Sequence, residues 1–331
     1  MNIQRTAGIL VLLTILGVSQ AAPQTIRIGS TAPQDSPWGR ALNQLASDWS
    51  DLSNGRINLQ IYHGGIAGDE ADVLRKIRIN QLQAGALTSG GMNSLTSEML
   101  TLSAPMLIQT DDEFEYVFEH IRPQLEESLR AERLHVLGWS FAGWVHFFSR
   151  NAIATPADLK QTRIATTPTE PEIHRAFQLM GYNTVSATIN EILPGLNSGM
   201  IDSFFTSPLA AAGFQYFAIA DHMLDIPVAP FLGVVVISDR LWQRLPADLR
   251  DQLEQAAQQA IHAMEAEVRH MTDEAINTMQ QYGLTVIRPE GAQKQLWLDE
   301  FNASREVAVG RVFDQDTYET IESLLEEYRS R

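Results

Sequence analysis

The chain has 331 residues, with 24 Lys and Arg against 40 Asp and Glu, and its formal net charge is -16. Phosphate groups and anionic lipids would repel so acidic a protein, which argues against nucleic-acid binding and against docking on a membrane surface. The sequence contains no cysteine, so disulfides, thiolate catalysis and zinc–thiolate sites are excluded. The length is sufficient for two domains with separate cores.

Residues 1–21 have the features of a signal peptide. Arg5 is the only charged side chain in this stretch, and Gly8–Val18 is an apolar run too short to span a bilayer. Small residues follow at Ser19-Gln20-Ala21, where a signal peptidase would cut. We therefore expect an exported, periplasmic protein with neither a lipid anchor nor a transmembrane helix.

The first part of the mature chain alternates between strands and helices. The expected elements are strand Thr25–Ser30, helix Trp38–Leu52, strand Arg56–Tyr62, a helix from Asp69 to about Gln81, and strand Ala84–Thr88. This alternation predicts a mostly parallel sheet covered on both faces, with ligands at the carboxyl ends of the strands.

Two long apolar segments, Leu134–Arg150 and Pro230–Ser238, are predicted to be neighbouring strands that cross between two domains. A second alternating unit lies between them, with strands Arg163–Thr166, Asn183–Ser186 and Asp202–Thr206 and helices Glu170–Met180, Ile189–Ser198 and Leu209–Ala220. The chain is expected to finish with strand Leu284–Ile287 and helices Gln293–Val309 and Thr317–Arg329.

The segment Pro246–Tyr282 is predicted to form one uninterrupted helix, because an apolar residue recurs every three or four positions. About 37 helical residues span roughly 55 Å. A domain of about 100 residues is only roughly 35 Å across, so this helix should contact more than one domain. The stripe contains more Ala and Met than Leu, which makes a coiled-coil dimer the less favoured alternative.

These elements predict two α/β domains hinged by crossing strands and by a long helix that spans both. The first domain is expected to comprise residues 22–145 and 235–265, and the second residues 146–234 and 266–331, with the connecting helix at 246–282. Phosphate loops and the G-x-G-x-x-G, H-E-x-x-H and G-x-S-x-G motifs are all absent from the sequence. We therefore expect a protein that is not an enzyme and needs no metal or cofactor.

Four segments carry a resemblance to a known family. Tyr62–Glu70 resembles "YPGGQLGDE", Asp158–Ala165 resembles "DLKGLKIR", Asn197–Ser203 resembles "xxGxVDG", and Trp242–Pro246 resembles the segment before the family's connecting helix. Through them the mature chain is similar to the DctP-type solute-binding proteins of tripartite ATP-independent periplasmic (TRAP) transporters.

The resemblance implies a periplasmic binding protein-like fold that closes on a solute and delivers it to a membrane permease, without catalysis. The expected partners are a small-molecule solute and the TRAP permease subunits, and the expected state is a monomer or homodimer. Three alternatives remain: a sensory protein that acts with a membrane receptor, an exported enzyme, and a scaffold that dimerises through the long helix.

The chain departs from the family where the family grips a carboxylate. The arginine that ends "KIR" is replaced by Ala165, and Arg163 matches the preceding lysine. Val145 occupies the place of a second basic residue, and Phe204, Thr206 and Ile189 replace polar or aromatic family residues. By the resemblance and the predicted loops, the ligand-binding residues are Thr31, Trp38, Glu70, Thr88, Gly91, Trp144, Val145, Arg163, Ala165, Thr167, Ile189, Phe204 and Thr206.

A bidentate arginine makes carboxylate binding tight and selective. Without it, we expect a solute that is more apolar than the usual family carboxylate, and a hydrophobic molecule is the candidate. Two alternatives remain for the site. The alignment could be off by one residue, which would leave Val145, Ala165 and Phe204 in the core, or the protein could be a conventional carboxylate binder that uses Arg163.

Overall fold

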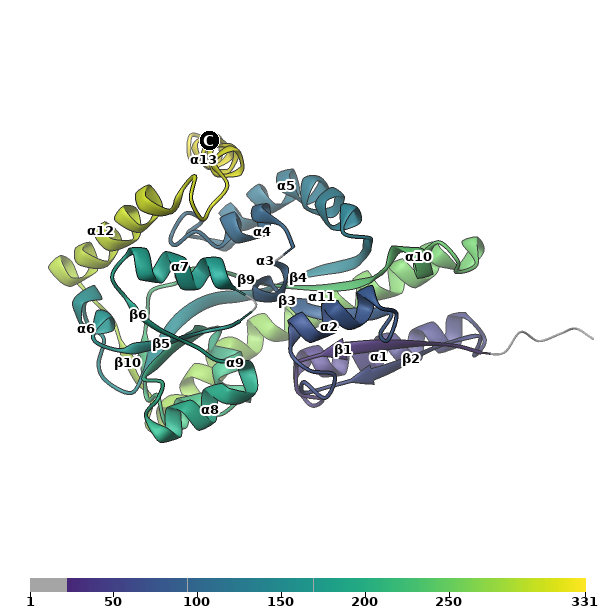
Figure 1. Cartoon of the computed structure of the whole chain (residues 1–331), viewed down its shortest axis with the longest axis horizontal. Helices are drawn as coiled ribbons and strands as arrows, with labels where there is room; N and C mark the ends of the chain where they lie inside the picture. Colours follow the sequence, from purple (N-terminus) through teal and green to yellow (C-terminus); the bar gives the residue numbers. More distant parts are fainter. Residues whose placement is uncertain (1–22, 94, 169) are drawn as a thin grey trace, which may run out of the picture.

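The computed structural model describes residues 23–93, 95–168 and 170–331. The signal peptide predicted at 1–21 lies outside these residues. Figure 1 shows an elongated molecule in which β1, β2 and α1 lie at one end of the long axis and α6 and α12 at the other. In the part of the chain that the structure describes, no helix is both long and apolar enough to cross a bilayer.

The strands have nearly the predicted bounds. They are β1 Gln24–Ser30, β2 Ile57–Tyr62, β3 Ala84–Thr88, β4 Leu134–Ser149, β5 Arg163–Thr166, β6 Asn183–Ser186, β7 Ser203–Thr206, β8 His222–Leu224, β9 Ala229–Ser238 and β10 Thr285–Ile287. The short strand β8 was not predicted, and it pairs with β10 and with the end of β4.

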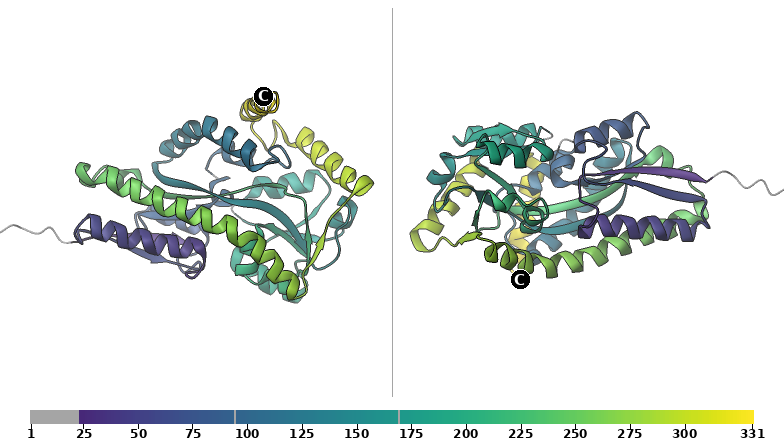
Figure 2. Two further views of the ribbon diagram at one scale, coloured as in Figure 1. Left: turned by 180° about the vertical axis from the view of Figure 1, so that it is seen from behind. Right: turned by 90° about the horizontal axis from the view of Figure 1, so that it is seen from below.

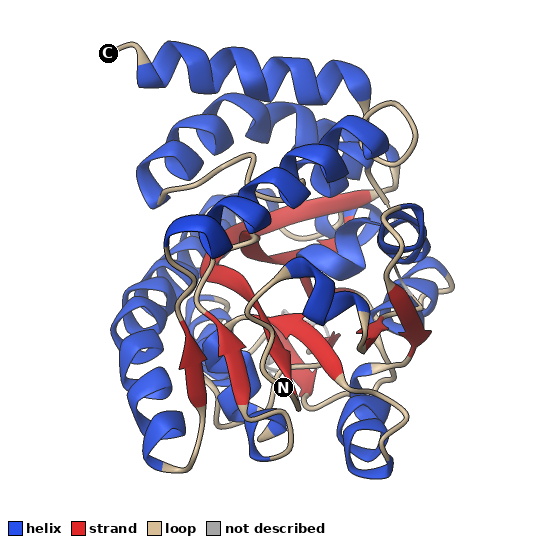
Figure 3. Ribbon diagram, turned by 90° about the vertical axis from the view of Figure 1, so that its left-hand side faces the viewer, coloured by secondary structure: helices blue, strands red, loops and turns tan. Residues whose placement is uncertain are grey.

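The helices are α1 Pro37–Leu52, α2 Glu70–Arg78, α3 Ser89–Asn93, α4 Ser97–Leu102, α5 Asp111–Ala131, α6 Pro156–Lys160, α7 Pro171–Leu179, α8 Ile189–Ser198, α9 Pro208–Gly213, α10 Asp239–Trp242, α11 Ala247–Gln281, α12 Gly291–Ala308 and α13 Gln315–Arg329. The segment predicted as one helix, Leu209–Ala220, divides into α9 and the 3-10 turn Tyr216–Ala218. Figure 3 shows helices on both sides of the strands.

The strands follow the order β2-β1-β3-β9-β4-β7-β5-β6. Parallel strands β2, β1 and β3 belong to what we call the first lobe (residues 23–133), and parallel strands β7, β5 and β6 to the second lobe (residues 150–228). Strand β4 joins them, because Leu134–Val145 pairs with β9 and His146–Ser149 pairs with β7. The prediction that the two long apolar segments are neighbouring strands is confirmed.

Strand β4 is bent between the lobes. Its register against β9 shifts between Val136 and Gly138 and again between Phe141 and Trp144. Gly143 lies within the second irregularity at a φ of 90°, a left-handed conformation that favours glycine. Gly138 and Gly143 thus coincide with the two irregularities of the strand.

The predicted long helix is confirmed as α11, with Pro246 before its first residue and Tyr282 after its last. Its first half packs through Leu249 and Leu253 against α1 and β1, and its last turns pack through Met279 against the second-lobe cluster around Phe204. Figure 2 shows α11 running along the back of the molecule. The helix therefore contacts both lobes.

The two C-terminal helices pack on different lobes. Trp297 of α12 joins a cluster with Phe147, whereas Ile321 and Leu325 of α13 join the cluster that contains Phe114 of α5. Helix α13 thus lies on the first lobe, although the sequence grouped residues 266–331 with the second domain. The exact division into domains stays a prediction.

Candidate functional site

A cavity of about 1080 Å³ lies between the lobes. Its size is slightly above the usual range for small-molecule sites, about 300–1,000 Å³. Both lobes and both crossing strands line it, for example Thr31 and Thr88 from the first lobe, Thr167 from the second, and Phe231 from β9. The cavity is the candidate site of this protein.

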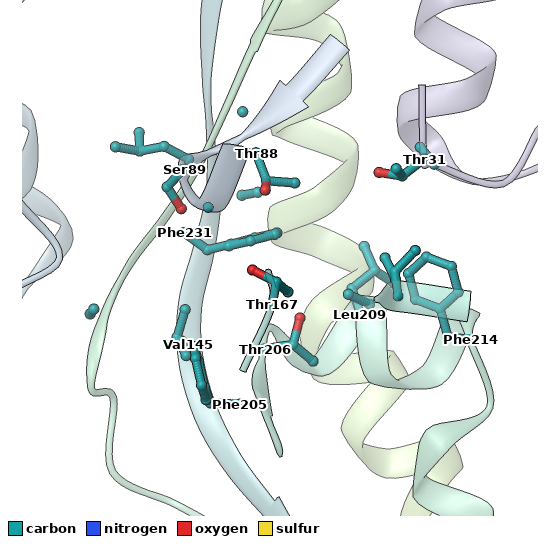
Figure 4. Close-up of a pocket in the computed structure, with 18 of the residues that line it drawn as sticks. Thr31, Thr88, Ser89, Val145, Thr167, Phe205, Thr206, Leu209, Phe214 and Phe231 are labelled. Carbon is teal, nitrogen blue, oxygen red and sulfur yellow. The ribbon is translucent and has the colours of Figure 1, made fainter. Parts of the chain in front are cut away.

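The fold explains why polar side chains gather there. Thr88 and Thr206 end β3 and β7, and Thr31 and Thr167 directly follow β1 and β5. All four sit at the carboxyl ends of parallel strands, which is the binding edge expected of such sheets. Figure 4 shows their hydroxyl groups directed into the space that the ring of Phe231 also enters.

Apolar side chains form most of the rest of the wall. Figure 4 shows Val145, Phe205, Leu209, Phe214 and Phe231 around the cavity. Among the described residues that line it, none is Lys, Arg or His. A bound carboxylate would therefore find no cationic partner in this wall.

Glu70, the first residue of α2, is a buried carboxyl in the wall, with 8 % of its surface exposed. It accepts a 2.7 Å hydrogen bond from the backbone N–H of Thr88 and a 2.9 Å bond from the Thr88 hydroxyl. The pKa of Glu70 is raised to about 7, chiefly by burial and in part by the nearby Glu170, against the lowering effect of the hydrogen bonds from Thr88. Ionisation of Glu70 in the folded protein is therefore less favourable than in water.

Glu170, the residue before α7, is a second buried carboxyl in the wall, with 9 % of its surface exposed. It accepts hydrogen bonds from Asn93 Nδ2 at 3.0 Å and from the Thr167 hydroxyl at 2.8 Å. Burial raises its pKa as well. Because Asn93 ends α3 in the first lobe, the bond from Asn93 to Glu170 links the two lobes across the cavity.

Nine of the predicted ligand-binding residues line the cavity: Thr31, Trp38, Glu70, Thr88, Val145, Thr167, Ile189, Phe204 and Thr206. Phe204 contributes little surface, because it is 1 % exposed and its ring stacks on Phe148 with 5.2 Å between the centroids. That these residues bind a solute stays a prediction.

The prediction that Arg163 belongs to the site requires a correction, because Arg163 does not line the cavity. Its Nε and Nη2 atoms donate to the two carboxylate oxygens of Asp202 at 2.6 and 2.9 Å, and its side chain is 49 % exposed. The Asp202 pair raises the pKa of Arg163. The expectation that Arg163 could contact the solute is therefore wrong for this structure.

Three further expected residues do not line the cavity. Ala165 is buried in the second-lobe core with Ile192 and Leu196. Gly91 lies behind Glu70, where a Cβ atom would collide with the Glu70 carboxyl. The indole N–H of Trp144 donates to Asp111 at 2.8 Å on the first lobe. The prediction that these three residues contact the solute is corrected accordingly.

The sequence did not single out several lining residues, including Asn93, Glu170, Leu209, Phe214 and Phe231. Phe231 had a detectable signal, because it lies early in the predicted return strand, next to the place where the strand crosses. Within residues 23–93, 95–168 and 170–331, no three His, Asp or Glu side chains are grouped as metal ligands would be.

Comparisons with known proteins point to one family. The family model described as "Bacterial extracellular solute-binding protein, family 7", DctP, matches residues 28–308. A solute-binding protein of Chromohalobacter salexigens is 21% identical over 261 residues, which are 76% of this chain and 75% of the relative. The C4-dicarboxylate-binding periplasmic protein DctP of Vibrio cholerae is 21% identical over 264 residues, or 80% and 79% of the two chains.

A solved structure has the same fold. It is a TRAP periplasmic solute-binding protein of Shewanella oneidensis with bound succinate, and it superposes with a TM-score of 0.85 at 17% identity. The superposition covers 92% of this chain and 100% of that one. The predicted two-lobed α/β architecture is therefore confirmed.

Proposed function

Because the chain belongs to family 7 of the bacterial extracellular solute-binding proteins, the DctP family, we propose that it is the periplasmic receptor of a TRAP-type transporter. It captures a small solute between its lobes and delivers the solute to membrane permease subunits. Membership of an extracellular family supports a periplasmic location. The cavity of about 1080 Å³ between the lobes is the observation that carries the proposal.

The construction of the hinge supports this role. Strands β4 and β9 and helix α11 run between the lobes, so a rotation of one lobe would bend a few segments and would leave both cores intact. The bulges of β4 place an irregular, bendable stretch in the crossing. A receptor needs such a hinge to open for capture and to close for delivery.

We further propose that the solute is more apolar than the acids named for its relatives, which are a C4-dicarboxylate and succinate. Closing two lobes on a carboxylate removes its water, and an unpaired buried charge costs several kcal/mol even after relaxation. The described wall offers aromatic rings and threonine hydroxyls but no cation, and it includes Glu70 and Glu170. An apolar body buried against Phe231 and Phe205 gains about 25 cal/mol per Å² instead.

Mass spectrometry of small molecules that co-purify with the mature protein tests this proposal. We expect a bound compound without a carboxylate, and calorimetry with succinate should show no binding. A heat-capacity decrease on binding of the recovered compound would report burial of apolar surface. Recovery of a dicarboxylate or sugar acid, bound tightly in calorimetry, would contradict the apolar solute and would leave the receptor role intact.

A further inference from the structure

Glu70, Glu170 and Asn93 form a polar region of the cavity wall. The two carboxyls come from opposite lobes, and Glu170 is near enough to act electrostatically on Glu70. They flank α3, since a Cβ atom on Gly90 would touch Glu170 and one on Gly91 would collide with Glu70. We call these three residues the acceptor region.

The described residues leave part of the hydrogen-bonding capacity of the acceptor region unfilled. An ionised carboxylate accepts about four hydrogen bonds, and the bonds to Glu170 from Asn93 and Thr167 supply two. Asn93 Oδ1 is buried and has no partner among the described residues, although its Nδ2 donates to Glu170. Buried acceptors of this kind are normally satisfied.

Building on the proposed receptor function, we propose that the solute carries a protonated amine that binds the acceptor region, while its apolar skeleton fills the rest of the cavity. An ammonium group has three N–H donors and no acceptor, so it complements Glu70, Glu170 and Asn93 Oδ1. Charge-assisted hydrogen bonds are also the stronger kind. An ammonium therefore donates to several of these acceptors and brings a positive charge to the two carboxyls.

Other head groups fit this region less well. A carboxylate would be repelled by the two glutamates and would meet no Lys, Arg or His in the described wall. A neutral hydroxyl could donate one hydrogen bond, but it would leave both buried carboxyls without a counter-charge. Removing water from an ammonium costs free energy, and this cost is offset only if the group pairs with an opposite charge. The acceptor region supplies that charge from both lobes.

The test compares three head groups on one skeleton. Calorimetry at pH 8 with the mature protein would use 2-phenylethylamine, 2-phenylethanol and phenylacetate, and then hexylamine, hexanol and hexanoate. We expect both amines to bind, the alcohols to bind at least about tenfold more weakly, and the acids not to bind. Absence of binding by both amines would overturn the inference.

The other outcomes separate this inference from the proposed function. If the alcohols bind as tightly as the amines, the proposal that the solute carries an amine is wrong. The proposal of a receptor for an apolar solute is then unaffected. If the acids bind more tightly than the amines, both the proposed amine and the proposed apolar solute are wrong.

Charge-removing variants test the acceptor region itself. Glu70→Gln and Glu170→Gln should each weaken amine binding by roughly tenfold to a hundredfold, the value of a charged hydrogen bond, and leave alcohol binding unchanged. Glu119→Gln is the matched control, since Glu119 is exposed on α5 and is not among the residues that line the cavity. Thermal unfolding would verify that each variant folds, and either glutamate variant alone suffices. Equal amine affinity in all three would overturn the inference.

Discussion

The carboxylate of Glu265 on α11 accepts a hydrogen bond from the backbone N–H of Phe141 in β4, with 2.6 Å between the nitrogen and Oε1. Phe141 lies at the irregularity where the register between β4 and β9 shifts. A bulge leaves a backbone group without its ladder partner, and the Glu265 carboxylate takes that place. Through this bond the long helix holds the crossing strand near the middle of the molecule.

Glu265→Ala should therefore lower the free energy of unfolding by about 1.5–3 kcal/mol, because it removes a charged acceptor from a half-buried N–H. The Glu265 side chain is only 16% exposed, so water replaces the carboxylate poorly. Urea unfolding measures the change. Glu265→Gln keeps an acceptor oxygen, so its free energy of unfolding should fall less than that of Glu265→Ala. Glu274→Ala on the exposed face of the same helix is the control, and equal stability of the two alanine variants would contradict this role.

Arg163→Ala should leave solute binding unchanged, because the Arg163 guanidinium pairs with Asp202 outside the cavity. The exposed position of Arg163 predicts only a small change in stability. Calorimetry with the co-purified solute measures the affinity. Loss of binding in this variant would show that Arg163 reaches the solute in some closed state, which would restore the conventional carboxylate binder.

Local sequence signals predicted most of the fold. β5, β6 and α8 have the expected bounds, because strand alternation and helical period are patterns that lie within a few residues. The length of α11 followed from an apolar stripe without Gly or Pro. The attachment of α13 to α5 could not be predicted, because it depends on contacts between segments about 200 residues apart.

The site was predictable only in part, for the same reason. Thr31 and Thr88 follow from the rule that ligands lie at the carboxyl ends of parallel strands. Glu170 reads as an ordinary acidic residue at a helix start, and its burial depends on Asn93 from the other lobe. Ala165 has the expected strand alternation, but α8 covers its side of β5. Which face of a strand meets the cavity is decided by packing that local sequence does not record.

Phe231→Ala should weaken binding of the co-purified solute by roughly tenfold to a hundredfold, the effect of removing one apolar contact surface. Phe231 is half-buried in β9 and enters the cavity in Figure 4. Calorimetry gives the affinity, and thermal unfolding separates a binding effect from a folding defect. Phe118→Ala is a useful control, because Phe118 is partly buried outside the cavity and packs on Phe114. Unchanged affinity for Phe231→Ala would remove this residue from the site.

The stability of the protein without solute should depend on pH through Glu70. The pKa of this carboxyl is raised from 4.5 to about 7, chiefly by burial, and Glu170 adds to the rise. Between these pH values the folded protein keeps a proton that the unfolded chain releases, so stability falls as the pH rises from about 4.5 to about 7 and then levels off. The difference between the two pKa values corresponds to about 3 kcal/mol.

Urea unfolding at pH 5 and pH 8 would measure this effect, with Glu70→Gln as the reference. The variant has no carboxyl to ionise at this position, so the stability of the wild type relative to the variant should fall by about 3 kcal/mol at most between the two pH values. An equal pH response in both proteins would show that Glu70 ionises normally. Addition of 2-phenylethylamine should reverse the trend, because an ammonium in the cavity stabilises the ionised carboxylate and binds more tightly as the pH rises.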